Sequence, residues 1–313
     1  MRPAVIGRRA LSGLLVLVGV SILAFSLVHL LPGDTAHAIA GEYASPEQVE
    51  RVRVELGLDK PIVVQYFSWL FGVLRGDFGT SLWTGRPALD MVLESVPPSV
   101  SISIVSILIS TVFGILLGTT AALNRGGFAD RAITFLASLG ISMPAFWVLL
   151  LLLVPFAIVN RWLPAVGYVP LTDGFWPWFS HIILPATALA VAHGAELARF
   201  TRGSAIDVLA APFIRASRAR GSGGWRLTRT HVLRNAAIPV ITVLGLQIGN
   251  LLGGVIVVET VAGINGLGLL AVNSILNRDF ILLQAYVLFA ATVIVVVNLV
   301  IDILYSVINP KVR

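Results

Sequence analysis

Long runs of residues without a charged side chain dominate the chain. A helix needs about 20 apolar residues to cross the hydrocarbon core of a membrane. Six runs without Asp, Glu, Lys or Arg meet that requirement, and we predict that each forms a transmembrane helix. The predicted spans are residues 10–33, 95–124, 132–160, 174–195, 235–258 and 280–301.

Two further apolar runs are not predicted to span the membrane. Residues 260–277 contain the segment GINGLG, which suits a loop or re-entrant turn better than a spanning helix. Residues 61–74 are too few to span and predict a helix at the membrane interface.

The first span could be mistaken for a signal peptide, because Ala36-His37-Ala38 after it resembles a cleavage site. Its apolar run, however, is longer than the roughly 7–15 residues of a signal peptide's apolar region. We therefore expect an uncleaved helix.

Composition supports a multi-pass membrane protein. Of the 313 residues, 57% are hydrophobic and only 12% are charged, and the mean hydropathy is +0.90. A soluble domain has about 25% charged residues, so this chain lacks the polar surface of a soluble fold. The absence of cysteine excludes disulfides and cysteine-bound metals within the chain.

Lysine and arginine predict the orientation. With the N-terminus inside, six spans place 15 basic residues in the cytoplasm and seven outside. Both termini are therefore expected in the cytoplasm. In a soluble protein the formal net charge of +6 would suggest nucleic-acid binding, but here the placement of the arginines matters more than their sum. We expect a lipid membrane, not nucleic acid, as the partner.

Two segments between the spans are long. Residues 32–96 are predicted to form an external helical loop, in which Ser45 is the N-cap and Pro46 the first residue of a helix ending near Gly57. Residues 202–234 form a basic cytoplasmic loop. No internal repeat divides the chain, so residues 1–313 are expected to form one membrane domain.

Catalytic motifs are missing. The chain has no Walker-type phosphate loop, no HExxH and no GxSxG. His193 and Glu196 have the wrong spacing for a zinc-binding helix. We therefore predict that the chain is not an enzyme and holds no cofactor.

A few polar residues within or near the spans have two interpretations each. Glu196 and Arg199, three residues apart, form either a local ion pair or part of a transport path. Glu259 either contacts substrate or caps a buried loop. Gln247 and Asn250 either line a path or join helices. The absence of a buried acid–base chain argues against an ion-coupled secondary carrier.

The basic loop contains a predicted short helix. Pro212 is suited to start it and Gly221 to end it, with IRASRAR between. Small residues on one side would permit close docking, and arginines on the other would pair with an acidic partner surface. The alternative is a loop whose positive charge only sets the topology.

The order of residues here resembles the EAA loop of ABC importer permeases, in the form found in the dipeptide, oligopeptide and nickel permeases. Arg215-Ala216-Ser217 followed by Gly221 falls on the EAA---G pattern, with Arg215 in place of the glutamate. The chain then reads HVLRNAAIPV, similar to the HxLRNALIPV of this branch, with Arg234 where the general family has proline.

Other segments along the chain are similar to the same branch. They are LLPGD at 30–34, LGLDKP at 56–61, GDFGTS at 76–81, PPS at 97–99, and ETV at 259–261 followed by GLG at 266–268. Ala262 and Asn265 depart from the branch pattern near the last of these. In this order along one chain, the motifs are specific.

The resemblance implies a type I ABC importer permease fold, a place in the cytoplasmic membrane of a prokaryotic cell, and a set of partners. These are a second homologous permease, two cytoplasmic ATPases that bind ATP and Mg²⁺, and an extracytoplasmic binding protein. The implied cargo is a di- or oligopeptide, with a nickel complex, haem, glutathione or a small glycan as alternatives. The implied ATPase-coupling residues are Ala211, Phe213, Arg215, Ala216, Ser217, Arg218 and Gly221, and the candidate path residues are Gln247, Asn250 and Glu259.

Overall fold

The computed structural model describes residues 3–30, 45–55, 57, 59–221 and 224–308. Outside this range lie the motif residues 31–34, the possible cleavage site at 36–38, and the C-terminal Lys311 and Arg313. The described part consists of helices and the loops that connect them, with an isolated bridge between Thr80 and Pro87. It forms two compact units, one of Met1–Val96 with Leu270–Leu299 and one of Pro97–Leu269 with Val300–Arg313.

The first unit combines the start of the chain with a late helix. Its helices are α1 (Pro3–Leu30), α3 (Pro46–Glu55), α4 (Ile62–Leu74), most of α12 (Leu267–Leu276) and most of α13 (Phe280–Ile308). α3 begins as predicted: the Ser45 hydroxyl accepts from the Gln48 amide at 3.3 Å, and the Gln48 side chain accepts from the Ser45 amide at 2.8 Å. These reciprocal bonds form a capping box.

The GDFGTS loop of the first unit is joined to the start of α13. Asp279 is buried and caps α13, accepting from the Leu282 amide at 3.2 Å. The same carboxylate accepts from the Ser81 hydroxyl and, at 3.3 Å, from the Leu82 amide. At Gly79, with φ of 80°, a β-carbon would lie 2.8 Å from Ile281. Thus the loop requires glycine at this close approach.

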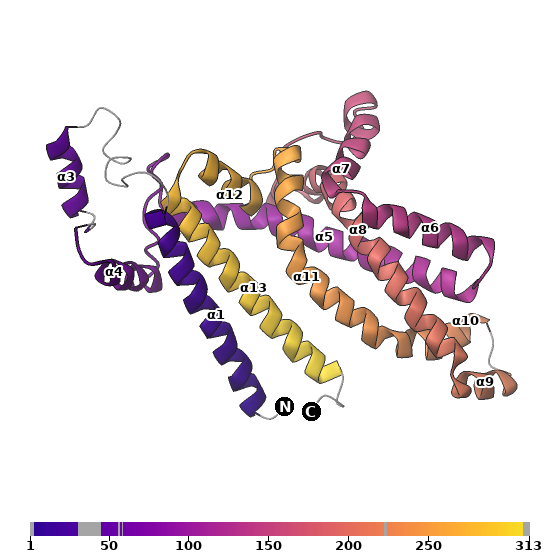
Figure 1. Cartoon of the computed structure of the whole chain (residues 1–313). Coiled ribbons are helices and arrows are strands. Elements are labelled where there is room, and N and C mark those ends of the chain that lie inside the picture. Colours follow the sequence, from indigo (N-terminus) through magenta and orange to yellow (C-terminus); the bar gives the residue numbers. More distant parts are fainter. Residues whose placement is uncertain (1–2, 31–44, 56, 58, 222–223, 309–313) are drawn as a thin grey trace. The chain divides into compact units, whose positions relative to one another are not determined.

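The second unit is built around one long helix, α8 (Phe175–Ala210), which packs on α6, α7 and α11 (Figure 1). Its core includes Ile182 and Leu189 of α8, with Leu149 of α7 and Val258 of α11. The other elements of this unit are α5 (Ala88–Leu123, shared with the first unit), α6 (Phe128–Ser142), α7 (Ala145–Leu153), η1 (Val154–Val159), η2 (Leu171–Asp173), α9 (Pro212–Ala219), α10 (Gly224–Leu227), η3 (Thr228–Leu233), α11 (Arg234–Ala262) and the start of α12 (Leu267–Leu276).

Small residues of α5 allow α8 to approach closely. A β-carbon at Gly114 would lie 2.8 Å from the side chain of Leu197, and one at Gly118 would lie 2.5 Å from the backbone oxygen of Ala198. The two glycines form a small-xxx-small pattern that packs helices within the chain, because only glycine admits α8 at such distances.

The third predicted span, residues 132–160, needs correction. It is not one straight helix: α6 ends at Ser142, and α7 begins after Pro144 at an angle of 104°. Met143 has extended dihedrals, φ −87° and ψ 125°, because the proline ring disfavours a helical conformation in the preceding residue. The charge-free run therefore forms a bent pair of helices.

Within the described residues, three helices are long and apolar enough to cross a membrane, and up to five spans result if each bent pair counts as one. The second bent pair joins the end of α11 to α12 at 80°. This break agrees with the interpretation of residues 260–277 as no ordinary span, although α12 itself is helical. The total of six spans stays a prediction.

Candidate coupling helix and polar contacts of the helix bundle

The predicted short helix of the basic loop is α9. Pro212 is its first residue, Arg220 its C-cap, and Gly221 follows in the left-handed region at φ 83°. Proline lacks an amide proton that the first turn would leave unpaired, and glycine adopts positive φ without strain. The predicted ends are confirmed.

One side of α9 is docked on its own chain. Ile214 is fully buried against Ala122, Ala205 and Val232, and Ser217 is buried on the same side. The opposite side is exposed and consists of residues 212, 213, 215, 216, 218 and 219. Ala216 therefore lies outward with the arginines, so the expected separation of small residues from arginines is incomplete.

The exposed side of α9 combines charge with apolar surface. Arg215 and Arg218 are exposed, and the Phe213 ring is 46% exposed between them and the start of the helix. Ala211 is half-buried and Gly221 is exposed. Such a surface is complementary to an apolar groove with an acidic rim.

Gln247 connects α11 to α8. It is buried, and its side-chain amide donates to the backbone oxygen of His193 at 2.9 Å and to the carboxylate of Glu196 at 2.9 Å. Both partners are acceptors, so the amide nitrogen must face them and the orientation of the amide is determined. The oxygen of Gln247 is buried without a hydrogen-bond partner. The contact favours the interpretation of Gln247 as a residue that joins helices.

The structure describes only some contacts of the remaining polar residues singled out in the sequence. The structure pairs Glu196 with Gln247, and among the described ion pairs there is none between Glu196 and Arg199. Both side chains are exposed. The side chain of Asn250 lies outside the described positions, so the role of Asn250 stays a prediction.

Replacing Gln247 with leucine is expected to weaken packing of α11 on α8 by about 0.6–2 kcal/mol, the range for hydrogen bonds between membrane helices. The loss is modest because leucine also removes the unpaired buried oxygen. The measurement is the thermal stability of the purified assembly, with transport measured in parallel. Altered transport in a variant of unchanged stability would contradict the packing role and favour the path.

Glu259 occupies the bend between α11 and α12. It is fully buried, and its carboxylate accepts from the Ser99 hydroxyl and from the amides of Gly268 at 2.7 Å and Leu269 at 3.2 Å. The Ser99 hydroxyl in turn accepts from the Leu267 amide at 2.8 Å. A carboxylate at the start of a helix satisfies amides that lack partners within the helix. The structure thus supports the interpretation of Glu259 as a cap.

The glycines of the GLG segment leave room for this carboxylate. A β-carbon at Gly266 would lie 2.2 Å from the Glu259 carboxylate, and one at Gly268 would lie 2.4 Å from the α-carbon of Ile256. Gly263, at φ 58°, ends α11 in the left-handed conformation. The segment that sequence analysis treated as a turn is therefore shaped around one buried acid.

Sequence analysis missed a paired acid near the start of α6. Asp130 is buried, and Arg202 of α8 donates two hydrogen bonds to its carboxylate, one of them from Nη2 at 2.8 Å. The Gly126 amide donates to the same carboxylate at 2.9 Å. Asp130 lies only two residues before a predicted span, where an acid is expected to have a partner, and this position could have identified it.

Replacing Arg202 with alanine should lower the midpoint of thermal unfolding, because the buried Asp130 carboxylate loses its charged partner. Arg202→Lys retains the charge without the two-bond geometry and should fall between alanine and wild type. The double variant Asp130→Asn, Arg202→Ala should recover part of the loss. Equal midpoints for Arg202→Ala and wild type would show that the pair contributes no net stability.

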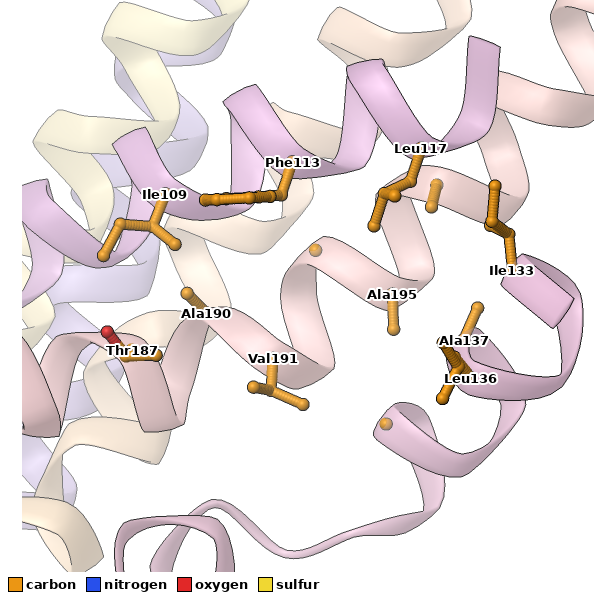
Figure 2. A pocket seen from close by; sticks show the side chains of 13 residues that line it. Ile109, Phe113, Leu117, Ile133, Leu136, Ala137, Thr187, Ala190, Val191 and Ala195 are labelled. Carbon is orange, nitrogen blue, oxygen red and sulfur yellow. The ribbon is translucent and has the colours of Figure 1, made fainter. Parts of the chain in front are cut away.

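A hollow between α5, α6 and α8 has a volume of about 340 Å³ (Figure 2). Phe113 and Leu117 of α5 line one side, and Ile133 and Leu136 of α6 line another. Thr187 is the one polar side chain of the lining. Such a surface provides no partner for the charged termini of a peptide. Among the described residues, no three His, Asp or Glu side chains are placed to hold a metal ion.

Comparisons with known proteins agree with this architecture. Residues 114–313 match the family described as binding-protein-dependent transport system inner membrane component, and residues 4–103 match the N-terminal part of such membrane components.

Two relatives match over nearly the full length. A probable peptide ABC transporter permease protein of Sinorhizobium fredii is 39% identical, the match covering 98% of each chain. A glutathione transport system permease protein of Salmonella choleraesuis is 42% identical, over 98% of this chain and 97% of the relative.

A similar fold occurs in an experimental structure. A chain of the MetNI methionine ABC transporter, solved in inward-facing conformations, matches with a TM-score of 0.58 and 15% identity, over 70% of this chain and 96% of that chain.

Proposed function

The chain belongs to the family of inner membrane components of binding-protein-dependent transport systems, and from this premise we propose that it imports di- or oligopeptides as one permease subunit of an ATP-driven importer. The match of both parts of the chain to this family carries the proposal. Membership also removes the reason to retain an ion-coupled secondary carrier. ATP hydrolysis belongs to separate ATPase subunits, so this chain is a transporter subunit and not an enzyme.

The cargo proposal rests on the relatives. One is named as a peptide permease and another as a glutathione permease. Glutathione is itself a small peptide, so both names agree with cargo that carries amide bonds and charged termini. Neither name refers to a nickel complex, haem or a small glycan.

For partners, we propose a second homologous permease, two cytoplasmic ATPases that hold ATP and Mg²⁺, and an extracytoplasmic binding protein facing residues 32–96. The termini and residues 202–234 would lie in the cytoplasm, as the distribution of basic residues predicts. No cofactor is proposed for this chain.

The proposed lever is α9 with its flanking residues 211–221. Ile214 and Ser217 anchor it to the chain's own core, while Phe213, Arg215, Ala216 and Arg218 are exposed toward a partner. When ATP draws the two ATPases together, a helix docked on them moves with them. A bistable helix bundle is then biased toward the outward-open state by nucleotide, and hydrolysis resets it.

Gln247 and Glu259 are less suited to a path in this conformation, because both are buried and hydrogen-bonded within the bundle. Their contact with cargo stays a prediction, as does that of Asn250. In the described state these two side chains stabilise contacts between helices.

The test of the proposed function is purification of the chain from its native membrane in mild detergent, followed by reconstitution into vesicles. We expect a second permease and Walker-motif ATPases to co-purify. The vesicles should take up a labelled peptide only with ATP and the binding protein present. Recovery of the complex without peptide uptake would overturn the cargo, and recovery of the chain alone would overturn the partners.

A further inference from the structure

Helix α4 exposes an apolar face that nothing in the described chain covers. Its 13 residues contain no charged side chain. Four apolar residues spaced at i, i+4, i+8 and i+11 are strongly exposed: Val63 (61%), Phe67 (50%), Phe71 (60%) and Leu74 (73%). This spacing places them on one side of the helix.

The other side of α4 is docked on α1. The hydroxyl of Tyr66 lies 2.8 Å from that of Ser21, within hydrogen-bond distance. The Phe25 ring lies 5.5 Å from the ring of Tyr66 and 5.7 Å from that of Trp69, measured between centroids. These contacts determine where along α1 the shorter helix lies.

Because α1 is predicted to span the membrane, the position along α1 at which α4 docks gives the depth of α4. α1 is the first predicted span, and Arg9 is the last charged residue before its apolar run. At 1.5 Å per residue, Ser21 and Phe25 lie roughly 18 and 24 Å along the helix from Arg9. The hydrocarbon core is about 30 Å thick, so the contact falls roughly 6–12 Å inside its far boundary.

A helix of this length docked at this depth cannot cross the membrane, since 13 residues extend only about 20 Å. We propose that α4 lies in the plane of the membrane, within the leaflet reached by the C-terminal end of α1. In that position Val63, Phe67, Phe71 and Leu74 contact lipid acyl chains.

Two observations favour lipid over a protein partner. α4 docks on a segment of α1 whose neighbouring residues Ile22 and Leu23 are 49% and 67% exposed, on a predicted span. Basic residues flank the helix at Lys60 and Arg75. Basic residues at the ends of an apolar helix are typical of the membrane interface, because their charged groups can extend to the polar headgroups.

The chain contains no cysteine, so single cysteines can be introduced without altering other residues. The experiment places a nitroxide label at Phe67→Cys, and separately at Phe71→Cys, in the assembled complex in lipid vesicles. Collision of the label with oxygen, which concentrates in hydrocarbon, is compared with collision with a water-soluble nickel chelate. Leu23→Cys on α1 is the lipid control, and Glu50→Cys on the charged helix α3 is the aqueous control.

We expect both α4 labels to match the Leu23 label, with high oxygen and low nickel accessibility. High nickel accessibility, as at Glu50, would overturn the proposal by placing the face in water. Low accessibility to both reagents would overturn it by placing a protein against the face. Two label sites guard against one variant that fails to fold, and label mobility in each variant reports whether α4 remains helical and docked.

Discussion

Replacing Glu259 with alanine is expected to destabilise the junction of α11 and α12 by about 3 kcal/mol or more, because two buried donors and one half-buried donor lose their acceptor at once. Those donors are the Ser99 hydroxyl and the amides of Gly268 and Leu269. We expect a lower unfolding midpoint for the purified complex and a matching loss of assembled transporter from the membrane.

Glu259→Gln provides the sharper comparison. Its amide oxygen can accept from the Gly268 and Leu269 amides, and its amide nitrogen can donate to the Ser99 oxygen. A capping role therefore predicts a much smaller loss for glutamine than for alanine. Thr260→Ala is the matched control, because the exposed Thr260 hydroxyl bonds only within its own helix, to the backbone oxygen of Ile256. A glutamine variant of wild-type stability without transport would instead assign the charge a role in the path.

Ala216→Glu is expected to abolish most ATP-dependent uptake while leaving membrane insertion intact. Ala216 lies on the exposed side of α9, so a larger side chain there does not disturb the buried contacts of Ile214. A carboxylate enclosed in a docked interface costs about 2 kcal/mol or more. Since about 1.4 kcal/mol is a tenfold change in affinity, docking of the ATPases should weaken by about thirtyfold or more, and uptake that depends on this docking should fall with it.

The control is Thr230→Glu, which adds the same charge to the same loop at an exposed position outside α9. It should insert and transport like wild type. Ala216 is a better test than Gly221, where φ of 83° would strain any substituted residue and confuse docking with folding. Wild-type uptake by Ala216→Glu, in a complex that retains its ATPases, would remove α9 from the coupling role.

Features determined by short segments could be predicted from the sequence. Apolar runs predict helices because a membrane span must satisfy every backbone group within itself. Ser45 with Gln48, and Pro212 with Gly221, act on helix ends only a few residues away, so their geometry follows from local sequence. The order of motifs likewise predicted the family, because it requires no knowledge of which helices meet.

The hydrogen-bond and ion-pair partners of the polar side chains could be identified only from the tertiary structure. One of the two interpretations of Glu196 paired it with Arg199, but Glu196 bonds to Gln247, which lies 51 residues away. Asp130 pairs with Arg202 across 72 residues. The sequence left Glu259 with two interpretations, contact with substrate or capping of a buried loop. Its hydrogen bond with Ser99 of α5 supports the capping role. The bend at Pro144 was likewise not predicted, because hydropathy gives the length of an apolar run but not the direction of the helices that it forms. The sequence by itself determined which segments are helical and apolar, whereas the packing of helices decided what each buried polar group contacts, because those contacts join residues that no local pattern relates.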